Sequence, residues 1–275
     1  MIIDLPKTTT TAVDKRLVSL RDEGGAVALG RVLTLVVIAD EADIEAAVEA
    51  ANDASREHPC RVLVLASAGP VTAEPQLDAQ IRVGGDAGAS EVVVLRTSGP
   101  LQEQPDAVVM PLLLPDAPIV VWWPRESPQT PAEHPIGRIA QRRITDSVMA
   151  AEPTAMIRSL GMHYATGDTD LAWARVTLWR GLLAAALEQP PYEPVTGVVI
   201  EGERNHTSLD LLAGWLAVRL RCAARIVHKP GATAITRVTL ERKGGNIVLD
   251  RPDGRVVTIS QAGSPTGASR SRSAG

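Results

Sequence analysis

The sequence predicts an α/β protein with a mixed-sheet N-terminal α/β domain and a smaller α+β domain ending in an antiparallel meander. Short apolar runs alternate with segments of helical periodicity in the first part, which is typical of βαβ units. In the second part, closely spaced strands are separated by Gly-containing turns. We expect the domains to cover residues 1–165 and 166–262, with a hinge at 166–168 and a disordered tail at 263–275.

Composition limits the class of protein. The 275 residues are 45% hydrophobic, which is enough for packed cores, and they include five Trp but no Phe. A net charge of −4 and a pI near 5.8 argue against a nucleic-acid partner. The N-terminus has neither the basic start nor the apolar core of a signal peptide, and no apolar run approaches the ~20 residues that span a bilayer. We therefore expect a cytoplasmic protein with no membrane partner.

The first domain begins with a helix that a capping-box-like Thr11–Asp14 segment opens. A continuous apolar strand at 32–39, a helix at 40–56 and a strand at 62–66 then form a predicted parallel βαβ unit. Apolar and polar residues alternate over 77–83, which indicates a half-exposed strand at a sheet edge. The remaining expected elements are buried strands at 91–95 and 119–123, a helical start at 105, and helices at 134–141 and 153–162.

Trp122 and Trp123 end the strand at 119–123 and are the most informative pair in the first domain. Neighbouring side chains on a strand point to opposite faces, so one core cannot bury both indoles. Each face must therefore meet something large: a helix layer, a second domain or a partner. We interpret the doublet as closing the first domain on one face and supporting the junction with the second on the other.

The second domain begins with the longest predicted helix, at 170–188. At 100° per residue, a leucine stripe would form its buried face, flanked by Arg175 and Trp179, with Trp173 and Arg180 turned away. Its leucines are Leu171, Leu178 and Leu182. A strand at 195–200 and a helix at 207–221 follow, and then strands at 224–227, 235–240, 246–249 and 255–259, of which the last three form the expected meander.

Motifs that carry chemistry are scarce. The glycines at 25 and 30 lack the Lys-Ser/Thr pair of a phosphate loop, and the segment at 84–88 is not a dinucleotide fingerprint. The sequence contains no nucleophile elbow, no HExxH and no paired-Cys metal site, and its five histidines have no ligand spacing. Asp168 and Asp170 could form a carboxylate pair, although helix capping is their favoured role. We therefore predict no catalytic, cofactor-binding or metal-binding residues.

Three segments, PLLLPDAPIVVWWP, GRIAQRRITDS and DLAWARVTLWRGLLA, carry a family resemblance. Together they resemble the glucose-6-phosphate dehydrogenase assembly proteins, the OpcA family, in its actinobacterial form. The similarity extends over residues 1–260, and the family continues past the meander into a helical segment that this chain replaces with a Ser/Gly/Arg tail. Cyanobacterial relatives are linked to thiol control, but Cys60 and Cys222 show no sign of a redox pair.

The resemblance implies a non-catalytic partner that binds glucose-6-phosphate dehydrogenase and promotes its active oligomer or conformation in the oxidative pentose phosphate pathway. On this basis Trp179→Ala or Arg175→Ala should weaken activation while leaving the fold largely intact. Two alternatives stay open: a sugar-phosphate enzyme, or a metabolite-sensing module that uses a pocket in the first domain. The family-like positions are candidates for partner or inter-domain contact: Trp122, Trp123, Arg143, Asp146, Ser147, Asp170, Trp173, Arg175, Trp179 and Arg180.

Overall fold

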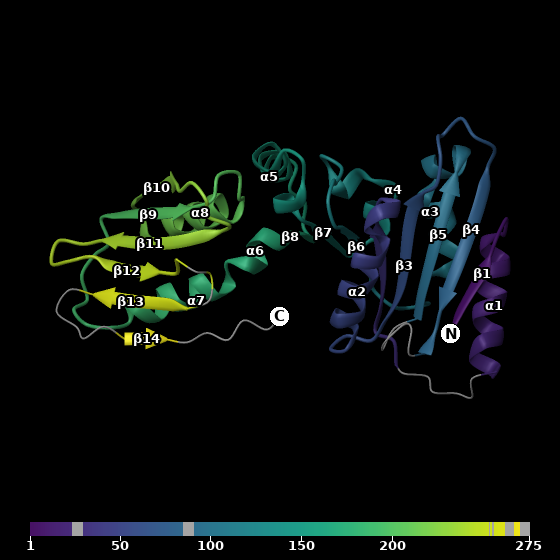
Figure 1. Cartoon of the computed structure of the whole chain (residues 1–275), viewed down its shortest axis with the longest axis horizontal. Helices are drawn as coiled ribbons and strands as arrows, with labels where there is room; N and C mark the ends of the chain where they lie inside the picture. Colours follow the sequence, from purple (N-terminus) through teal and green to yellow (C-terminus); the bar gives the residue numbers. More distant parts are fainter. Residues whose placement is uncertain (24–29, 85–90, 253, 255, 262–266, 270–275) are drawn as a thin grey trace. The chain divides into compact units, whose positions relative to one another are not determined.

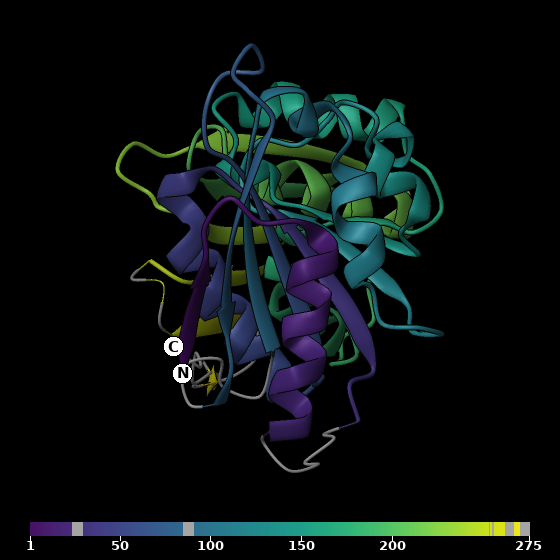
Figure 2. The same cartoon turned by 90° about the vertical axis from the view of Figure 1, so that its right-hand side faces the viewer.

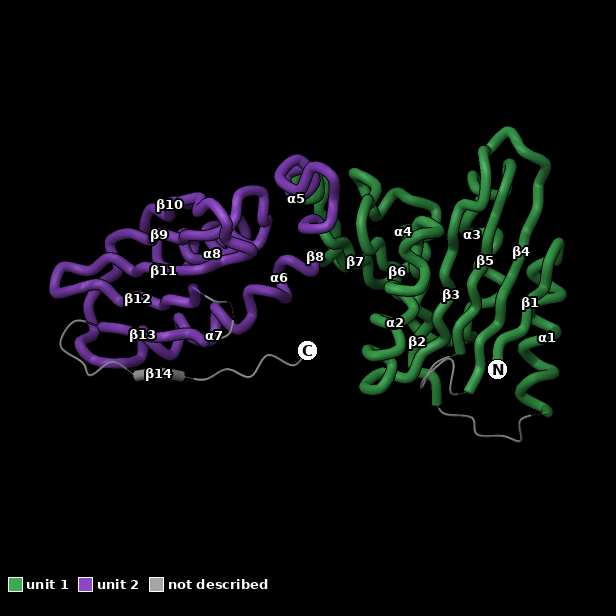
Figure 3. The backbone as a smooth tube through the Cα atoms, viewed as in Figure 1, with its two compact units in different colours: residues 1–146, 159–169 green, residues 147–158, 170–275 purple. Residues whose placement is uncertain are grey.

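The chain divides into two compact units (Figure 3). The computed structural model describes residues 1–23, 30–84, 91–252, 254, 256–261 and 267–269. Unit 1 comprises residues 1–146 and 159–169, and unit 2 comprises residues 147–158 and 170–275. The α-helix α5 (Pro153–Met162) has the predicted bounds, and its residues are shared between the two units.

Unit 1 is built on an eight-stranded sheet (Figure 1), and the prediction that this sheet is mixed is confirmed. The five strands from β5 to β7 run parallel to one another, and β4 and β1 are antiparallel to their neighbours. Taken in chain order, the parallel strands have the arrangement 3-2-1-4-5 of a doubly wound sheet. Across the sheet the order is β1 (Ile2–Leu5), β4 (Gln76–Arg82), β5 (Glu91–Ser98), β3 (Cys60–Ser67), β2 (Leu33–Ile38), β6 (Ile119–Trp123), β7 (Arg142–Thr145) and β8 (Asp168–Asp170).

The predicted βαβ unit is confirmed as β2, α2 (Ile44–Ser55) and β3. The two strands pair in parallel register from Leu33 opposite Cys60 to Ile38 opposite Leu65. A short 3-10 turn, Glu41–Asp43, precedes α2, and the side chain of Asp40 makes no capping hydrogen bond. The α-helix therefore starts later than the predicted range, 40–56.

Helices cover both faces of the sheet in unit 1. One face packs against α1 (Thr10–Glu23), α3 (Pro105–Val109) and α4 (Pro135–Ile139), and the other packs against α2. Figure 2 shows α1 and α2 on opposite sides of the strands. Successive residues of β3 and β5 alternate between the two cores, which explains why these strands read as continuous apolar runs.

Trp122 and Trp123 divide between the two cores as the strand alternation requires. Trp123 is 2% exposed and lies in the core formed with α1 and α4. Its ring meets the His134 ring edge to face, with the centroids 5.4 Å apart. Trp122 is half-buried and packs against the core beneath α2. The expectation that both faces of this strand end must be covered is confirmed within unit 1.

Two details of unit 1 differ from the sequence expectations. β4 is not an edge strand, because β1 pairs with it from Ile2 opposite Arg82 to Leu5 opposite Ala79. The polar alternation of β4 reflects one partly solvated face, which does not require an unpaired edge. Helix α1 begins at Thr10, and the Thr9 hydroxyl accepts the capping hydrogen bond from the Ala12 amide at 3.2 Å.

Unit 2 is a six-stranded sheet with α7 (Thr177–Leu187) and α8 (Ser208–Leu220) packed on one face. β9 and β10 are parallel, and β11, β12 and β13 form the predicted antiparallel meander. Most of the predicted tail, residues 263–266 and 270–275, lies outside the described residues. The strand order is β10 (Ala223–His228), β9 (Gly197–Gly202), β11 (Ile235–Glu241), β12 (Ile247–Asp250), β13 (Val257–Gln261) and β14 (Gly267–Ser269).

β14 is an exception to the expected disorder of the tail. It pairs antiparallel with β13, from Gly267 opposite Ile259 to Ser269 opposite Val257. Without β14, β13 would be the edge strand and would leave backbone N–H and C=O groups unpaired, and a short segment can pair with these groups.

The predicted helix at 170–188 is two helices, α6 (Leu171–Arg175) and α7 (Thr177–Leu187), separated at Val176. The predicted leucine stripe is wrong, since Leu178 is 44% exposed. The sequence offers two overlapping apolar stripes, and packing against α8 and the sheet selects the one that contains the larger indole. The buried residues are Ala172, Val176, Trp179, Leu183 and Ala186.

Truncating Trp179 should therefore destabilise unit 2, so the expectation that Trp179→Ala leaves the fold largely intact is wrong for this core residue. Trp179 is 3% exposed, so Trp179→Ala removes a large core side chain and should cost about 3–5 kcal/mol in the free energy of unfolding. Tyr192 is 77% exposed, and Tyr192→Ala is the matched aromatic control, expected within about 0.5 kcal/mol of the unsubstituted chain. Urea denaturation followed by circular dichroism makes the comparison; equal effects would contradict the core assignment.

Candidate functional site

Half of the ten family-like positions are buried side chains of the framework. Trp123 and Trp179 belong to the cores of units 1 and 2, respectively. Arg143, Asp146 and Ser147 are 7%, 4% and 0% exposed. Side chains as buried as these stabilise the fold beneath a surface but cannot themselves contact a partner. The ten family-like positions are thus divided between the interior and the surface of the two units.

Arg143 connects the C-terminal end of α4 to the start of β8 within unit 1 through hydrogen bonds and an ion pair. Its guanidinium donates to the carbonyl oxygens of Gly137 at 3.1 Å and Ala140 at 2.9 Å. It also donates to the carbonyl of Thr166 and forms an ion pair with Asp168. Five donors on one rigid guanidinium suit such a junction of backbone carbonyls. The unit 1 residues of the predicted hinge, 166–168, are therefore held by one arginine.

Asp170 and Ser147 form a polar junction within unit 2. The Ser147 amide and hydroxyl each donate to the Asp170 carboxylate at 2.9 Å, and the Ser147 hydroxyl lies 2.7 Å from that of Thr207. Asp170 also accepts from the Ala172 amide at 2.9 Å and so caps α6. The capping role favoured for Asp170 is confirmed.

Trp173, Arg175 and Arg180 are the more accessible members of the set in unit 2. The Arg180 guanidinium carbon lies 3.9 Å from the centroid of the Trp173 ring, a cation–π contact. Arg180 also donates to the Thr177 hydroxyl at 2.9 Å. Arg175 is exposed near the end of α6. This accessible group, the Trp173–Arg180 stack with Arg175, combines the side chains most enriched at interface hot spots.

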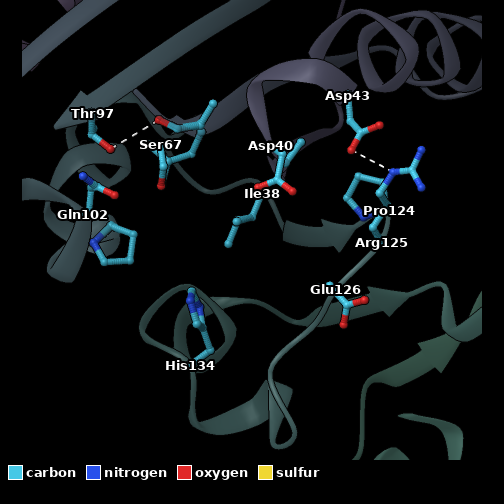
Figure 4. Close-up of a pocket in the computed structure, with 14 residues that line it drawn as sticks. Ile38, Asp40, Asp43, Ser67, Thr97, Gln102, Pro124, Arg125, Glu126 and His134 are labelled. Carbon is cyan, nitrogen blue, oxygen red and sulfur yellow. Dashed lines mark hydrogen bonds and ion pairs between the residues drawn. The ribbon is translucent and has the colours of Figure 1, made fainter. Parts of the chain in front are cut away.

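A cavity of about 170 Å³ lies at the carboxyl ends of the parallel strands in unit 1 (Figure 4). Its walls come from residues that follow β2, β3, β5 and β6, together with His134 before α4. In doubly wound sheets ligands bind at this edge, where the strand order reverses; here β3 and β6 flank β2. The lining residues are Ile38, Ala39, Asp40, Asp43, Leu65, Ala66, Ser67, Thr97, Gln102, Pro105, Pro124, Arg125, Glu126 and His134.

A larger hollow, of about 430 Å³, lies beside the start of α1 in unit 1. Lys7, Thr10, Gln76 and Gln104 line it with several apolar residues. It is not at the strand-order reversal, so the smaller cavity has the stronger claim to be a ligand site.

We call the cavity of about 170 Å³ the switch-point cavity, because it lies where the strand order reverses. The turn from β2 into α2 determines much of its charge. A dinucleotide-binding sheet places a glycine-rich turn here so that backbone amides can approach a pyrophosphate. This chain has Asp40, Glu41 and Asp43 and no glycine between β2 and α2. Asp43 pairs with Arg125 at 2.8 Å, and Glu41 pairs with Arg96 at 2.8 Å. The residues present do not fit a nucleotide cofactor, because carboxylates stand where its phosphates would bind.

Among the described residues that line this cavity, His134 is the one histidine. Its Nδ1 accepts from the Ile136 amide at 3.3 Å, which places the proton of the neutral ring on Nε2. Burial lowers the pKa of His134 below its ordinary value of 6.5, and Asp106 opposes that shift. The imidazole is thus held neutral, with one N–H to donate. The sequence predicted His134 as the first residue of a helix, whereas it caps α4, which starts at Pro135. It was given no role, because its neighbours in the cavity come from distant strand ends.

Other sites that the sequence raised are only partly described. The glycine-rich segments lie mostly at 24–29 and 85–90, outside the described residues. Cys60 is buried, and burial raises the pKa of the Cys222 thiol. Across the described ranges there is no cluster of three or more His, Cys, Asp or Glu that could hold a metal ion. Within the same ranges, no helix has both the length and the apolar character needed to cross a bilayer.

Comparison with solved structures finds dehydrogenase-like chains of low similarity. Levoglucosan dehydrogenase in complex with NADH and L-sorbose has a TM-score of 0.48 at 12% identity, covering 88% of this chain and 80% of that one. An oxidoreductase from Sinorhizobium meliloti has a TM-score of 0.42 at 10% identity, over 86% and 77% of the two chains. Likeness at this level carries no argument about activity.

The fold and site define an α/β chain of two units in which the turn between β2 and α2 is acidic. Two family models match it: the glucose-6-phosphate dehydrogenase subunit N-terminal domain over residues 51–162, and the corresponding C-terminal domain over residues 166–273. The chain belongs to this family, the OpcA family of glucose-6-phosphate dehydrogenase assembly proteins.

Two cyanobacterial relatives are provisionally named OxPP cycle protein OpcA. The protein from Synechococcus elongatus is 27% identical over 230 residues, 78% of this chain and 50% of the relative. The one from Synechocystis sp. is 25% identical over 210 residues, 68% of this chain and 43% of the relative. The chain thus spans about half the length of the curated relatives it matches.

The lowered pKa of His134 predicts a pH-dependent stability of unit 1. Below pH 6.5 the unfolded chain binds a proton more readily than the folded chain, so this histidine destabilises the fold as the pH falls. The loss of urea resistance between about pH 7.5 and about pH 5.5 should therefore be smaller in His134→Gln. His163→Gln, at an exposed histidine of unit 1, is the control. An unchanged loss in His134→Gln would contradict the assignment.

Proposed function

We propose that this chain is a cytoplasmic, non-catalytic subunit that binds glucose-6-phosphate dehydrogenase and promotes its active oligomer or conformation in the oxidative pentose phosphate pathway. The observation that carries the proposal is the match of both family domains, at 51–162 and 166–273. Both domains are described as parts of a glucose-6-phosphate dehydrogenase subunit, and the relatives are named for the OxPP cycle.

The chemistry of unit 1 supports a non-catalytic role. A dehydrogenase on a doubly wound sheet needs a turn that accepts the phosphates of its cofactor. In this chain Asp40 and Asp43 stand in that turn, and Arg125 is already paired with Asp43. Electrostatic repulsion of phosphates also weakens the alternative of a sugar-phosphate enzyme that uses this cavity.

The accessible group of unit 2, Trp173, Arg175 and Arg180, is the proposed contact with the dehydrogenase. Arg180 lies on the Trp173 ring, and this stack presents a flat, partly apolar surface with positive charge. Only a difference in affinity between two states of the dehydrogenase can shift it toward the active one. A difference of about 1.4 kcal/mol shifts the equilibrium tenfold, which is within the range of one hot-spot residue.

Trp122 is the remaining candidate and belongs to unit 1. It is half-buried against the core beneath α2, and its indole N–H is buried with no hydrogen-bond partner in the described part of the chain. The buried N–H cannot reach a partner, but the accessible part of the half-buried indole ring offers an apolar surface that a partner can contact. We include Trp122 as a second, weaker point of contact.

Substitution of Arg175 tests the proposed surface. Arg175→Ala should raise the concentration of this protein that gives half-maximal activation of the purified dehydrogenase by about tenfold, because it removes a central charged contact. Arg219→Ala is the matched control, since Arg219 is an exposed arginine on α8 of the same unit.

The possible outcomes distinguish an error in the proposed contact surface from an error in the proposed function. Equal activation by both variants would show that Arg175 lies outside the interface. No effect of the unsubstituted protein on the dehydrogenase would contradict the proposed function itself. Circular dichroism of each variant checks that the substitutions leave the fold unchanged.

A further inference from the structure

Three polar side chains face the switch-point cavity of unit 1 without a protein partner. Asp40 follows β2, Ser67 ends β3, and His134 precedes α4. Figure 4 shows them on different sides of one space, with the imidazole of His134 pointing into it. Among the described residues, the Asp40 carboxylate, the Ser67 hydroxyl and the His134 Nε2–H have no hydrogen-bond partner. Asp40 and Ser67 are exposed and His134 is half-buried, so a ligand would replace water at these groups.

These three groups differ in what they can exchange with a ligand. The Asp40 carboxylate only accepts hydrogen bonds, the neutral His134 ring donates from Nε2, and the Ser67 hydroxyl does both. An ammonium ligand would satisfy Asp40 but leaves the His134 donor unmatched. A hydroxyl group both donates and accepts, so a ligand with several hydroxyls can satisfy all three positions.

The charges around the cavity disfavour the binding of anions. The lining includes three carboxylates, Asp40, Asp43 and Glu126, against the single guanidinium of Arg125. Arg125 is paired with Asp43 at 2.8 Å, so its charge is largely compensated. A phosphate brought next to Asp40 would meet an uncompensated like charge. A neutral ligand meets no such cost.

The size of the cavity limits the ligand further. Its volume of about 170 Å³ is below the range of roughly 300–1,000 Å³ found for drug-sized ligands. A dinucleotide does not fit this space, whereas a single sugar ring or a short alditol does. Ile38, Leu65 and Pro105 give the cavity apolar wall on which the carbon face of such a ring can pack.

We propose that the cavity binds an uncharged polyhydroxylated small molecule, of the size of one sugar, through Asp40, Ser67 and His134. Phosphorylated sugars and dinucleotides are rejected. The site lies wholly within unit 1, and its occupation does not depend on the dehydrogenase. The inference therefore goes beyond the proposed function and adds a binding site for an unphosphorylated metabolite.

Ligand-observed NMR and calorimetry on the full chain test the proposal without any enzyme assay. The neutral probes are D-glucose, sorbitol and myo-inositol; D-glucose 6-phosphate is the anionic counterpart, and spermidine is the cationic one. At least one neutral probe should bind saturably, and D-glucose 6-phosphate should bind about tenfold more weakly than D-glucose or worse. Asp40→Asn should weaken the neutral probe about tenfold, because it replaces a charged acceptor.

Matched variants assign the binding to the cavity. Ser67→Ala and His134→Gln should each weaken the neutral probe, whereas Asp53→Asn, at an exposed carboxylate near the end of α2, should not. The proposal is overturned if no neutral probe saturates, or if only spermidine binds. It is also overturned if D-glucose 6-phosphate binds as tightly as D-glucose, or if Asp40→Asn and His134→Gln both leave the affinity unchanged.

Discussion

Neighbouring side chains on β6 point to opposite faces of the sheet, and the arrangement of unit 1 depends on that constraint. Trp123 fills the core shared with α1 and α4, and Trp122 packs on the side of α2. The edge-to-face contact of Trp123 with His134 then holds the imidazole at the carboxyl edge of the strands. The alternation of side chains along β6 thus places one indole in each core. It also positions His134 in the cavity where the parallel strands end.

Much of this fold is predictable from the sequence, because its strongest signals are periodic. The apolar runs of β2, β3 and β5 and the amphipathic α2 gave a parallel unit that the structure confirms. The strands that escaped prediction, β1, β7, β8 and β14, have at most four residues each, too few to show a period. The buried face of α6 and α7 was also predicted wrongly, because either of two apolar stripes could have been the buried one.

The candidate site was harder to predict because its members are brought together only by the topology. Asp40, Ser67 and His134 are separated by many residues, and none belongs to a recognised motif. The acidic turn after β2 could have been noticed, since a glycine-rich turn is what a doubly wound cofactor site requires there. Several conspicuous residues have framework roles instead: Arg143 binds backbone carbonyls, and Ser147 and Asp170 bind each other.

A family match over both units, an acidic turn at the cofactor position and an accessible Trp–Arg surface together favour a partner of an enzyme over an enzyme. Light scattering coupled to size-exclusion chromatography, with this chain and the purified glucose-6-phosphate dehydrogenase of the same organism, measures that relationship directly. The account predicts one co-eluting species whose mass contains both proteins in a fixed ratio. Separate elution at the masses of the two isolated proteins, at micromolar concentrations of each, would contradict it.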